Sequence, residues 1–109
     1  MNEQDPIVVL VTAGSADEAA NIARPLVEER LVACVNIVPG VRSIYRWEGK
    51  VADDTEWLLL MKTTRARFGA VEARVRELHS YAVPEVIALD VAAGSRPYLD
   101  WLLGSVANA

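Results

Sequence analysis

The sequence predicts a single α+β domain of the ferredoxin-like type, a β-α-β-β-α-β sandwich followed by a short C-terminal helix. Three observations predict it. The chain has 109 residues, a length that suits one domain. Four nearly continuous apolar runs indicate strands, and two segments with apolar residues at helical spacing separate them. Their order along the chain is that of the split βαβ arrangement. We expect residues 1–109 to form this one domain, with an ordered core over about residues 7–103.

The first strand and helix are predicted from the N-terminal quarter of the chain. Residues 7–11 read Ile-Val-Val-Leu-Val, which is typical of a strand. Ser15 and Glu18 have the spacing of a capping box, so a helix is expected to begin after Ser15. Pro25 lies inside that helix and should clash with the Asn21 carbonyl, which predicts a kink or a split helix.

The next two strands are predicted as a hairpin. Residues 31–38 form an apolar run, and Pro39-Gly40 should interrupt it as a bulge or bend. The extended segment resumes over residues 41–47. Residues 48–50, Glu-Gly-Lys, predict a turn, and the returning strand should run from Val51 to Thr63.

The second helix is expected to begin near Thr64, a possible N-cap, and to end near His79. Its apolar stripe has the spacing i, i+3, i+7, i+10 and consists of Phe68, Val71, Val75 and Leu78. Residues 86–91 predict the fourth strand. Gly94-Ser95 should begin the C-terminal helix, with Pro97 in its first turn.

Composition and charge exclude several classes of protein. Eleven basic and fifteen acidic residues give a net charge of −4 without a basic block, which argues against a nucleic-acid partner. No apolar run is long enough to span a membrane, and the polar, acidic N-terminus is unlike a secretory signal. One Cys favours a reducing cytoplasm, and one Cys with one His excludes a Cys/His zinc site within a single chain.

The strands also predict an oligomer. Two helices on one face of the sheet would leave the other face in water, and its strands should then alternate apolar and polar residues. The predicted strands are instead nearly continuous apolar runs. We therefore expect other copies of the chain to cover the second face.

His79, Tyr81 and Glu85 surround a proline on the loop after the second helix. Imidazole and carboxylate together suit copper or zinc, so His79 and Glu85 are candidate metal ligands, with a third ligand needed from elsewhere. The alternative is that His79 is only a charged cap of the helix C-terminus. Lys62 and the amides after Thr64 are candidates for binding a small anion, whereas the alternative is simple N-capping by threonine.

The remaining candidates are interpreted mainly as structural. Cys34 reads as a small buried hydrophobe, with a metal or nucleophile role as the alternative, and Asn36 as a satisfied core amide. The hairpin has an acidic run that consists of Asp53, Asp54 and Glu56. We interpret this run as a solvated flank of the hairpin, with a weak site for a hard cation as the alternative. The three tryptophans read as packing or interface anchors: Trp47, Trp57 and Trp101. The sequence contains no recognisable pattern that pairs a nucleophile with a base, so no enzyme is predicted.

Several segments together resemble the CutA family of divalent-cation tolerance proteins. They are Ala-Cys-Val-Asn-Ile-Val-Pro-Gly at 33–40, Ser-Ile-Tyr-Arg-Trp-Glu-Gly-Lys-Val at 43–51, Lys62-Thr63, His-Ser-Tyr-Ala-Val-Pro-Glu at 79–85 and Tyr-Leu-Asp-Trp-Leu at 98–102. The resemblance extends over nearly the whole chain. It implies a ferredoxin-like subunit in a homotrimer like the PII signalling proteins, in the cytoplasm, linked to tolerance of copper and other divalent ions.

The resemblance also implies clefts between subunits, lined by Lys62, Thr63, Tyr81 and Trp47. Some family members carry Cys, His and Glu where this chain has Val11, Leu78 and Ala82, so only His79 carries over from that ligand set. The leading hypothesis is a trimeric, non-enzymatic protein of metal-ion tolerance that requires no cofactor and binds copper weakly through His79, with Glu85 as helper. The alternatives are a PII-like sensor of a small anionic metabolite and a trimeric interaction scaffold.

Overall fold

The computed structural model describes residues 2–107 and has the predicted element order. The elements are β1 (Pro6–Ala13), α1 (Ala16–Glu28), β2 (Cys34–Trp47), β3 (Lys50–Thr64), the 3₁₀ turn η1 (Arg65–Arg67), α2 (Phe68–Leu78), β4 (Ile87–Asp90) and α3 (Arg96–Val106). The predicted α+β, ferredoxin-like fold is confirmed. Three residues of the expected 1–109 domain, namely 1, 108 and 109, lie outside the described residues.

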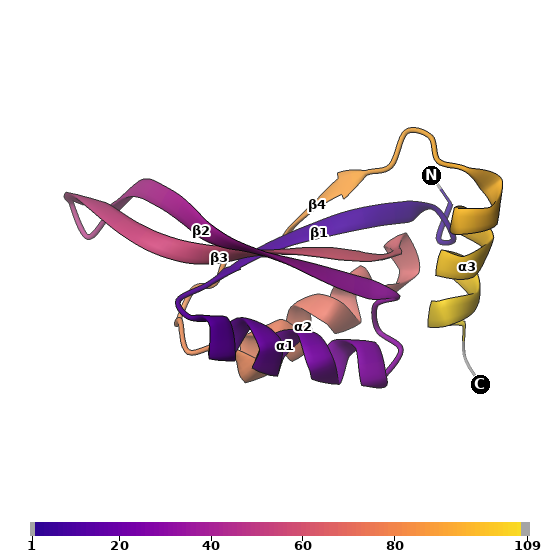
Figure 1. Ribbon diagram of the computed structural model, residues 1–109, viewed down its shortest axis with the longest axis horizontal. Helices are drawn as coiled ribbons and strands as arrows, with labels where there is room; N and C mark the ends of the chain where they lie inside the picture. The colour runs from indigo at the N-terminus through magenta and orange to yellow at the C-terminus, as the bar shows by residue number, and fades with distance from the viewer. Residues whose placement is uncertain (1, 108–109) are drawn as a thin grey trace.

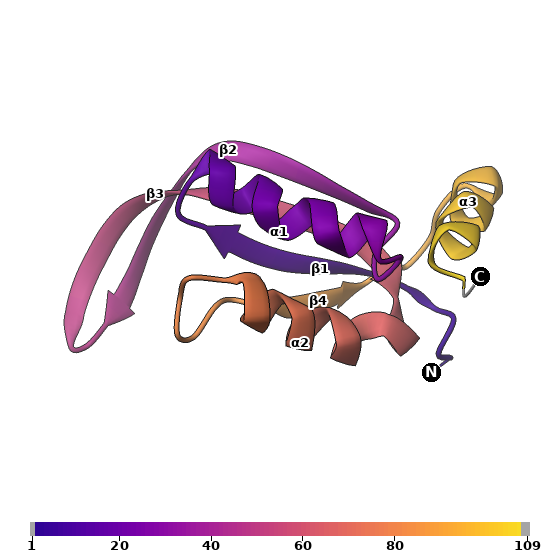
Figure 2. The ribbon, with the colours of Figure 1, turned by 90° about the horizontal axis from the view of Figure 1, so that it is seen from below.

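The four strands form one antiparallel sheet in the order β2-β3-β1-β4. Helices α1 and α2 lie on the same face of this sheet, and α3 lies beyond one end of it (Figures 1 and 2). Alternate residues of β1 point toward the helices and are buried: Ile7, Val9, Val11 and Ala13. They form the core with Leu59 and Met61 of β3 and with the apolar stripes of α1 and α2, which confirms the predicted stripe of the second helix.

The opposite face of the sheet is also apolar. Residues directly opposite each other in neighbouring strands share a face, and the registers Leu10↔Leu60, Leu10↔Ile87 and Val8↔Leu89 define this one. None of these side chains is fully buried, and Ile87 and Leu89 are 51% and 54% exposed. Helix α3 covers only the end of the sheet, where Leu102 and Val106 bury themselves against Ala33. We name the row Val8, Leu10, Leu60, Ile87 and Leu89 the open face.

Strands β2 and β3 extend beyond the sheet as a two-stranded ribbon. Strand β1 pairs with β3 only from Trp57 onward, whereas β2 pairs with β3 as far as Lys50. The ribbon therefore projects away from the helices (Figure 1). The predicted bulge is confirmed as a register shift between Val38 and Val41, and the predicted turn as a two-residue loop with positive φ at Glu48 and Gly49.

Three local details differ from the predictions. Of the two outcomes predicted at Pro25, a kink or a split helix, the split is wrong: α1 is one helix, because Pro25 lies in its last turn and the Glu29 N–H still donates to the Pro25 carbonyl at 2.8 Å. Strand β2 begins at Cys34 rather than Leu31, because the amides of Leu31 and Val32 are used to close the end of α1. Helix α2 begins at Phe68 because the 3₁₀ turn η1 follows Thr64.

Candidate functional site

The residues predicted to form a site fall in two separate places within one chain. Tyr81, Trp47 and Glu85 line a groove between the ribbon and the loop that follows α2. Lys62 and Thr63 lie at the other end of β3, at least six residues along the strand from the part that lines the groove. Such a stretch of strand is about 20 Å long, so one chain does not bring the two sets together.

The groove has a volume of about 810 Å³. The ribbon provides one wall, with residues 42–45, Trp47, Asp54 and Glu56. The loop provides the other wall with Tyr81, Ala82, Val83 and Glu85, and Thr12 lies at the base. This volume lies in the range of small-molecule sites.

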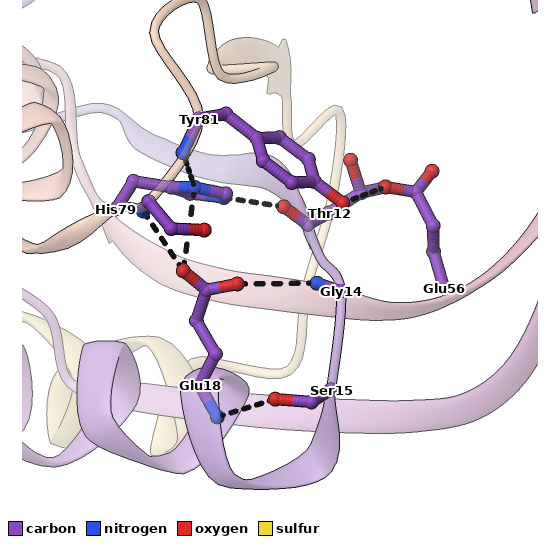
Figure 3. A network of polar contacts seen from close by, with 8 residues as sticks. Thr12, Gly14, Ser15, Glu18, Glu56, His79 and Tyr81 are labelled. Atoms are coloured by element: carbon purple, nitrogen blue, oxygen red, sulfur yellow. Dashed lines mark hydrogen bonds and ion pairs between the residues drawn. The ribbon is translucent and has the colours of Figure 1, made fainter.

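His79 is buried behind this groove, where both of its ring nitrogens are occupied. Nε2 lies 2.7 Å from the Thr12 carbonyl, and the Tyr81 N–H donates to Nδ1 at 3.1 Å (Figure 3). Because Nδ1 accepts from the Tyr81 N–H, Nε2 is the nitrogen that donates to the Thr12 carbonyl. His79 thus fixes the loop to β1. Its position after the last helical residue agrees with the predicted helix end.

Glu18 joins the helix N-terminus to the same loop. Its backbone N–H donates to the Ser15 hydroxyl at 3.1 Å, which confirms the cap at Ser15. Its carboxylate accepts from the Gly14 and Ser80 amides at 3.3 and 2.8 Å rather than from Ser15 (Figure 3). Burial alone would raise the pKa of Glu18, but the hydrogen bonds from Ser80 and Gly14 together hold it below its ordinary value.

Glu56 corrects the prediction of a solvated acidic flank. Glu56 is only 6% exposed, and its Oε2 accepts a hydrogen bond from the Tyr81 hydroxyl at 2.9 Å (Figure 3). Burial and this hydrogen bond raise the pKa of Tyr81 far above its ordinary value. Glu56 was missed because it ends a run of acidic residues. Its place two residues before Leu58 puts it on the same side of β3 as the open face, so the strand pattern contained no signal of its burial, which goes with the contact to Tyr81.

The other acidic residues near the groove are exposed. Asp53 pairs with Arg42 through two hydrogen bonds of 2.9 and 2.7 Å, and Arg42 lowers the pKa of this carboxyl group. Asp54 accepts from the Tyr45 hydroxyl at 2.6 Å, which raises the pKa of that phenol. Partial burial, with Glu56 nearby, raises the pKa of Glu85.

The predicted anion site at Lys62 has few free donors. The backbone amides of Arg65 and Ala66 donate to the carbonyls of Asp5 and Glu3, so the amides after Thr64 are already used. The Thr63 hydroxyl is buried and donates to the Leu31 carbonyl at 2.7 Å. The Lys62 ammonium lies 5.4 Å from the centre of the Tyr98 ring, a cation–π distance.

Other candidates are placed as follows. Cys34 is half-buried, and its thiol lies 3.7 Å from the Asn36 Oδ1. Asn36 is exposed on the sheet, so its prediction as a core amide is wrong. Trp57 packs against the core as predicted, whereas Trp47 and Trp101 are about half exposed.

Within residues 2–107, no group of three or more His, Cys, Asp or Glu side chains is placed to hold a metal ion. In the same residues, no helix is long and apolar enough to cross a membrane.

Comparison with known proteins gives one consistent family. The sequence profile of a family described as "CutA1 divalent ion tolerance protein" matches residues 7–105. A relative from Thermus thermophilus named "Divalent-cation tolerance protein CutA" is 59% identical over 95 residues, which cover 87% of this chain and 92% of the relative. "Protein CutA, chloroplastic" of Arabidopsis thaliana is 47% identical over 102 residues, 94% of this chain but 56% of that longer protein.

Solved structures agree with the sequence relatives. A structure titled "Divalent cation tolerance protein (Cut A1)" from Thermus thermophilus superposes with a TM-score of 0.91 at 55% identity, covering 94% of this chain and 99% of that one. A structure from Archaeoglobus fulgidus, titled as a periplasmic divalent cation tolerance protein, gives a TM-score of 0.91 at 37% identity over 94% and 99% of the two chains.

Proposed function

The chain belongs to the CutA1 divalent ion tolerance family, and from this premise we propose that it acts in the tolerance of divalent cations, copper among them. It does so as a non-enzymatic homotrimer in the cytoplasm and binds copper weakly. The observation that carries the proposal is the family match, which extends over residues 7–105 and so includes every helix and strand except the first residue of β1 and the last of α3.

The proposed metal ligands are His79 and Glu85. Imidazole nitrogen and carboxylate oxygen both suit a divalent cation such as copper. Binding at His79 must displace either the Thr12 carbonyl or the Tyr81 amide, each a hydrogen bond worth about 1 kcal/mol. Glu85 is exposed at the groove and needs no such displacement. Because a third ligand must come from another subunit or from water, weak binding is expected.

Titration calorimetry with Cu²⁺ tests the two ligands. We expect wild type to bind, His79→Ala and Glu85→Gln each to weaken binding about tenfold, and Glu28→Gln, an exposed carboxylate on α1, to leave it unchanged. Equal affinities in wild type and His79→Ala would remove His79 from the site, and the same result for Glu85→Gln would remove Glu85.

The homotrimer is supported by the open face. Apolar side chains from three strands lie there, and α3 covers only the end of the sheet. An exposed apolar surface of this kind marks an interaction site in a water-soluble domain. Continuous apolar strands are common where both faces of a sheet are covered.

A second candidate function is a PII-like response to a small anionic metabolite near Lys62. The observation that favours it is that no salt bridge within residues 2–107 involves the Lys62 ammonium, which lies over Tyr98 instead. A thermal-shift screen of anionic metabolites should show stabilisation that Lys62→Ala abolishes. Stabilisation that persists in Lys62→Ala, or none in wild type, would exclude this function.

A further inference from the structure

Lys62 and the groove lie on one side of the sheet, although far apart within one chain. Lys62 is opposite Val8 in the pairing of β3 with β1, and Val8 belongs to the open face, so Lys62 lies on that face as well. Among the described residues whose pairing defines this face, Lys62 is the one that carries a charge. Six residues earlier, Glu56 lies on the same side of β3, directly before the part of this strand that pairs with β1.

Lys62 needs a counter-charge once the open face is covered. The homotrimer proposed above buries this face, and a buried ammonium is costly unless a carboxylate compensates it. The Lys62 ammonium lies 5.4 Å from the centre of the Tyr98 ring, and no salt bridge within residues 2–107 involves it. Glu56 of the same chain is about 20 Å away along β3, beyond the reach of the lysine side chain. The carboxylate therefore has to come from another copy.

Glu56 has the position and an available oxygen for this role. Its Oε2 accepts from the Tyr81 hydroxyl, whereas its Oε1 accepts no hydrogen bond from residues 2–107. Oε1 is not among the buried atoms of these residues that lack a partner, so it is accessible from the groove that Glu56 lines. Arg42 is the one cationic residue among those lining the groove, and Asp53 on the same ribbon already pairs with it. The groove thus offers a carboxylate oxygen where the open face ends.

We propose that the Lys62 ammonium of one copy enters the groove of the next copy and forms an ion pair with Glu56 there. This inference rests on the homotrimer of the proposed function. Each copy gives its Lys62 to one neighbour and receives that of the other, and such a head-to-tail contact closes into a ring. The pair sets the register between two open faces, because complementary charges fix how an interface is aligned. It also occupies the ammonium that the PII-like function would need for a small anion.

Coupling of the full-length protein with a water-soluble carbodiimide tests the pair. This reagent joins an amine and a carboxylate that are in contact as an amide, while the reagent itself takes up the water. The chain has two lysines, Lys50 and Lys62, so the coupled amine is readily assigned. We expect dimers and trimers that survive denaturing electrophoresis, and a Lys62–Glu56 cross-linked peptide in the mass spectrum. Lys62→Arg keeps the charge but cannot be coupled, so it should sediment as a trimer and lose the cross-link.

Matched variants at exposed positions serve as controls. Lys50→Arg on the ribbon and Glu28→Gln on α1 should keep the cross-link, whereas Glu56→Gln should lose it. The Lys62→Arg result does not depend on whether a variant at the buried Glu56 folds. A wild-type trimer without a cross-link between copies, or with Lys62 joined to another carboxylate, would overturn the pair and leave the homotrimer standing. A wild-type monomer in sedimentation would overturn the homotrimer itself, and the pair with it.

Discussion

Single residues around His79 decide the shape of the candidate site. The His79 imidazole joins the loop after α2 to β1, and the Glu18 carboxylate joins the same loop to the start of α1. Gly14 leaves room for this arrangement, because a Cβ there would lie 3.1 Å from the Tyr81 hydroxyl. The loop that carries Tyr81 and Glu85 is thus held by polar contacts at its base, while its tip remains at the groove.

We predict that Glu18→Gln lowers the free energy of unfolding at pH 7. We also predict that this free energy depends less on pH in the variant than in wild type. The folded pKa of Glu18 lies below its ordinary value of 4.5, so ionised Glu18 stabilises the fold above that pH. This contribution is lost as the pH falls below 4.5 toward the folded pKa. The amide –NH₂ of Gln would face the Gly14 or Ser80 N–H, at a cost of about 1 kcal/mol at pH 7.

Urea denaturation at several pH values measures this effect. The difference between wild type and Glu18→Gln should shrink as the pH falls below 4.5, whereas Glu28→Gln should track wild type. A difference that is constant with pH would mean that the carboxylate charge does not contribute.

Among the elements, α1 ends in a capping motif that holds an arginine in a backbone conformation favoured by glycine. The Leu31 N–H donates to the Leu26 carbonyl and the Arg30 N–H to the Val27 carbonyl, the two bonds of a Schellman motif. This motif places Arg30 at φ 60°, a left-handed conformation that favours glycine. The helix therefore ends with strain in one residue, and β2 begins later than the apolar run suggests.

We predict that Arg30→Gly stabilises the protein by about 0.5–1 kcal/mol. Glycine removes the left-handed strain, and its greater freedom in the unfolded chain offsets part of the gain. Thermal or urea unfolding measures the change. Arg24→Gly is the matched control, because the same substitution inside α1 should destabilise by about 1 kcal/mol. A destabilising Arg30→Gly would show that the arginine side chain makes a compensating contact.

On the scale of the whole molecule, one chain leaves two apolar surfaces uncovered. The open face carries Leu10, Leu60 and their neighbours, and the ribbon exposes Ile44 and Val51 at 63% and 67%. On folding, a chain of 109 residues buries only about two-thirds of the surface that it exposes when unfolded, so its own hydrophobic core is small. Assembly of several copies would extend this core across the sheet.

We predict that Leu60→Lys dissociates the proposed trimer. A lysine in the middle of a buried apolar interface leaves an unpaired charge, which costs several kcal/mol per subunit contact. Sedimentation at micromolar concentration should show a trimer for wild type and monomers for Leu60→Lys. Val27→Lys, at an exposed position on α1, should remain trimeric. A wild-type monomer, or a trimeric Leu60→Lys, would contradict an interface on the open face.

The sequence by itself determined the element order, the bulge, the hairpin turn and the apolar stripes, because each depends on residues close together in the chain. It also carried the resemblance to the family that the comparisons later showed. Only the tertiary structure decided that His79 faces inward with both nitrogens bonded and that Glu56 is buried beneath Tyr81. It likewise separated Lys62 from the groove. These features depend on contacts between β1, β3 and the loop after α2, which are tens of residues apart, and local spacing contains no information about which side chains such contacts bring together.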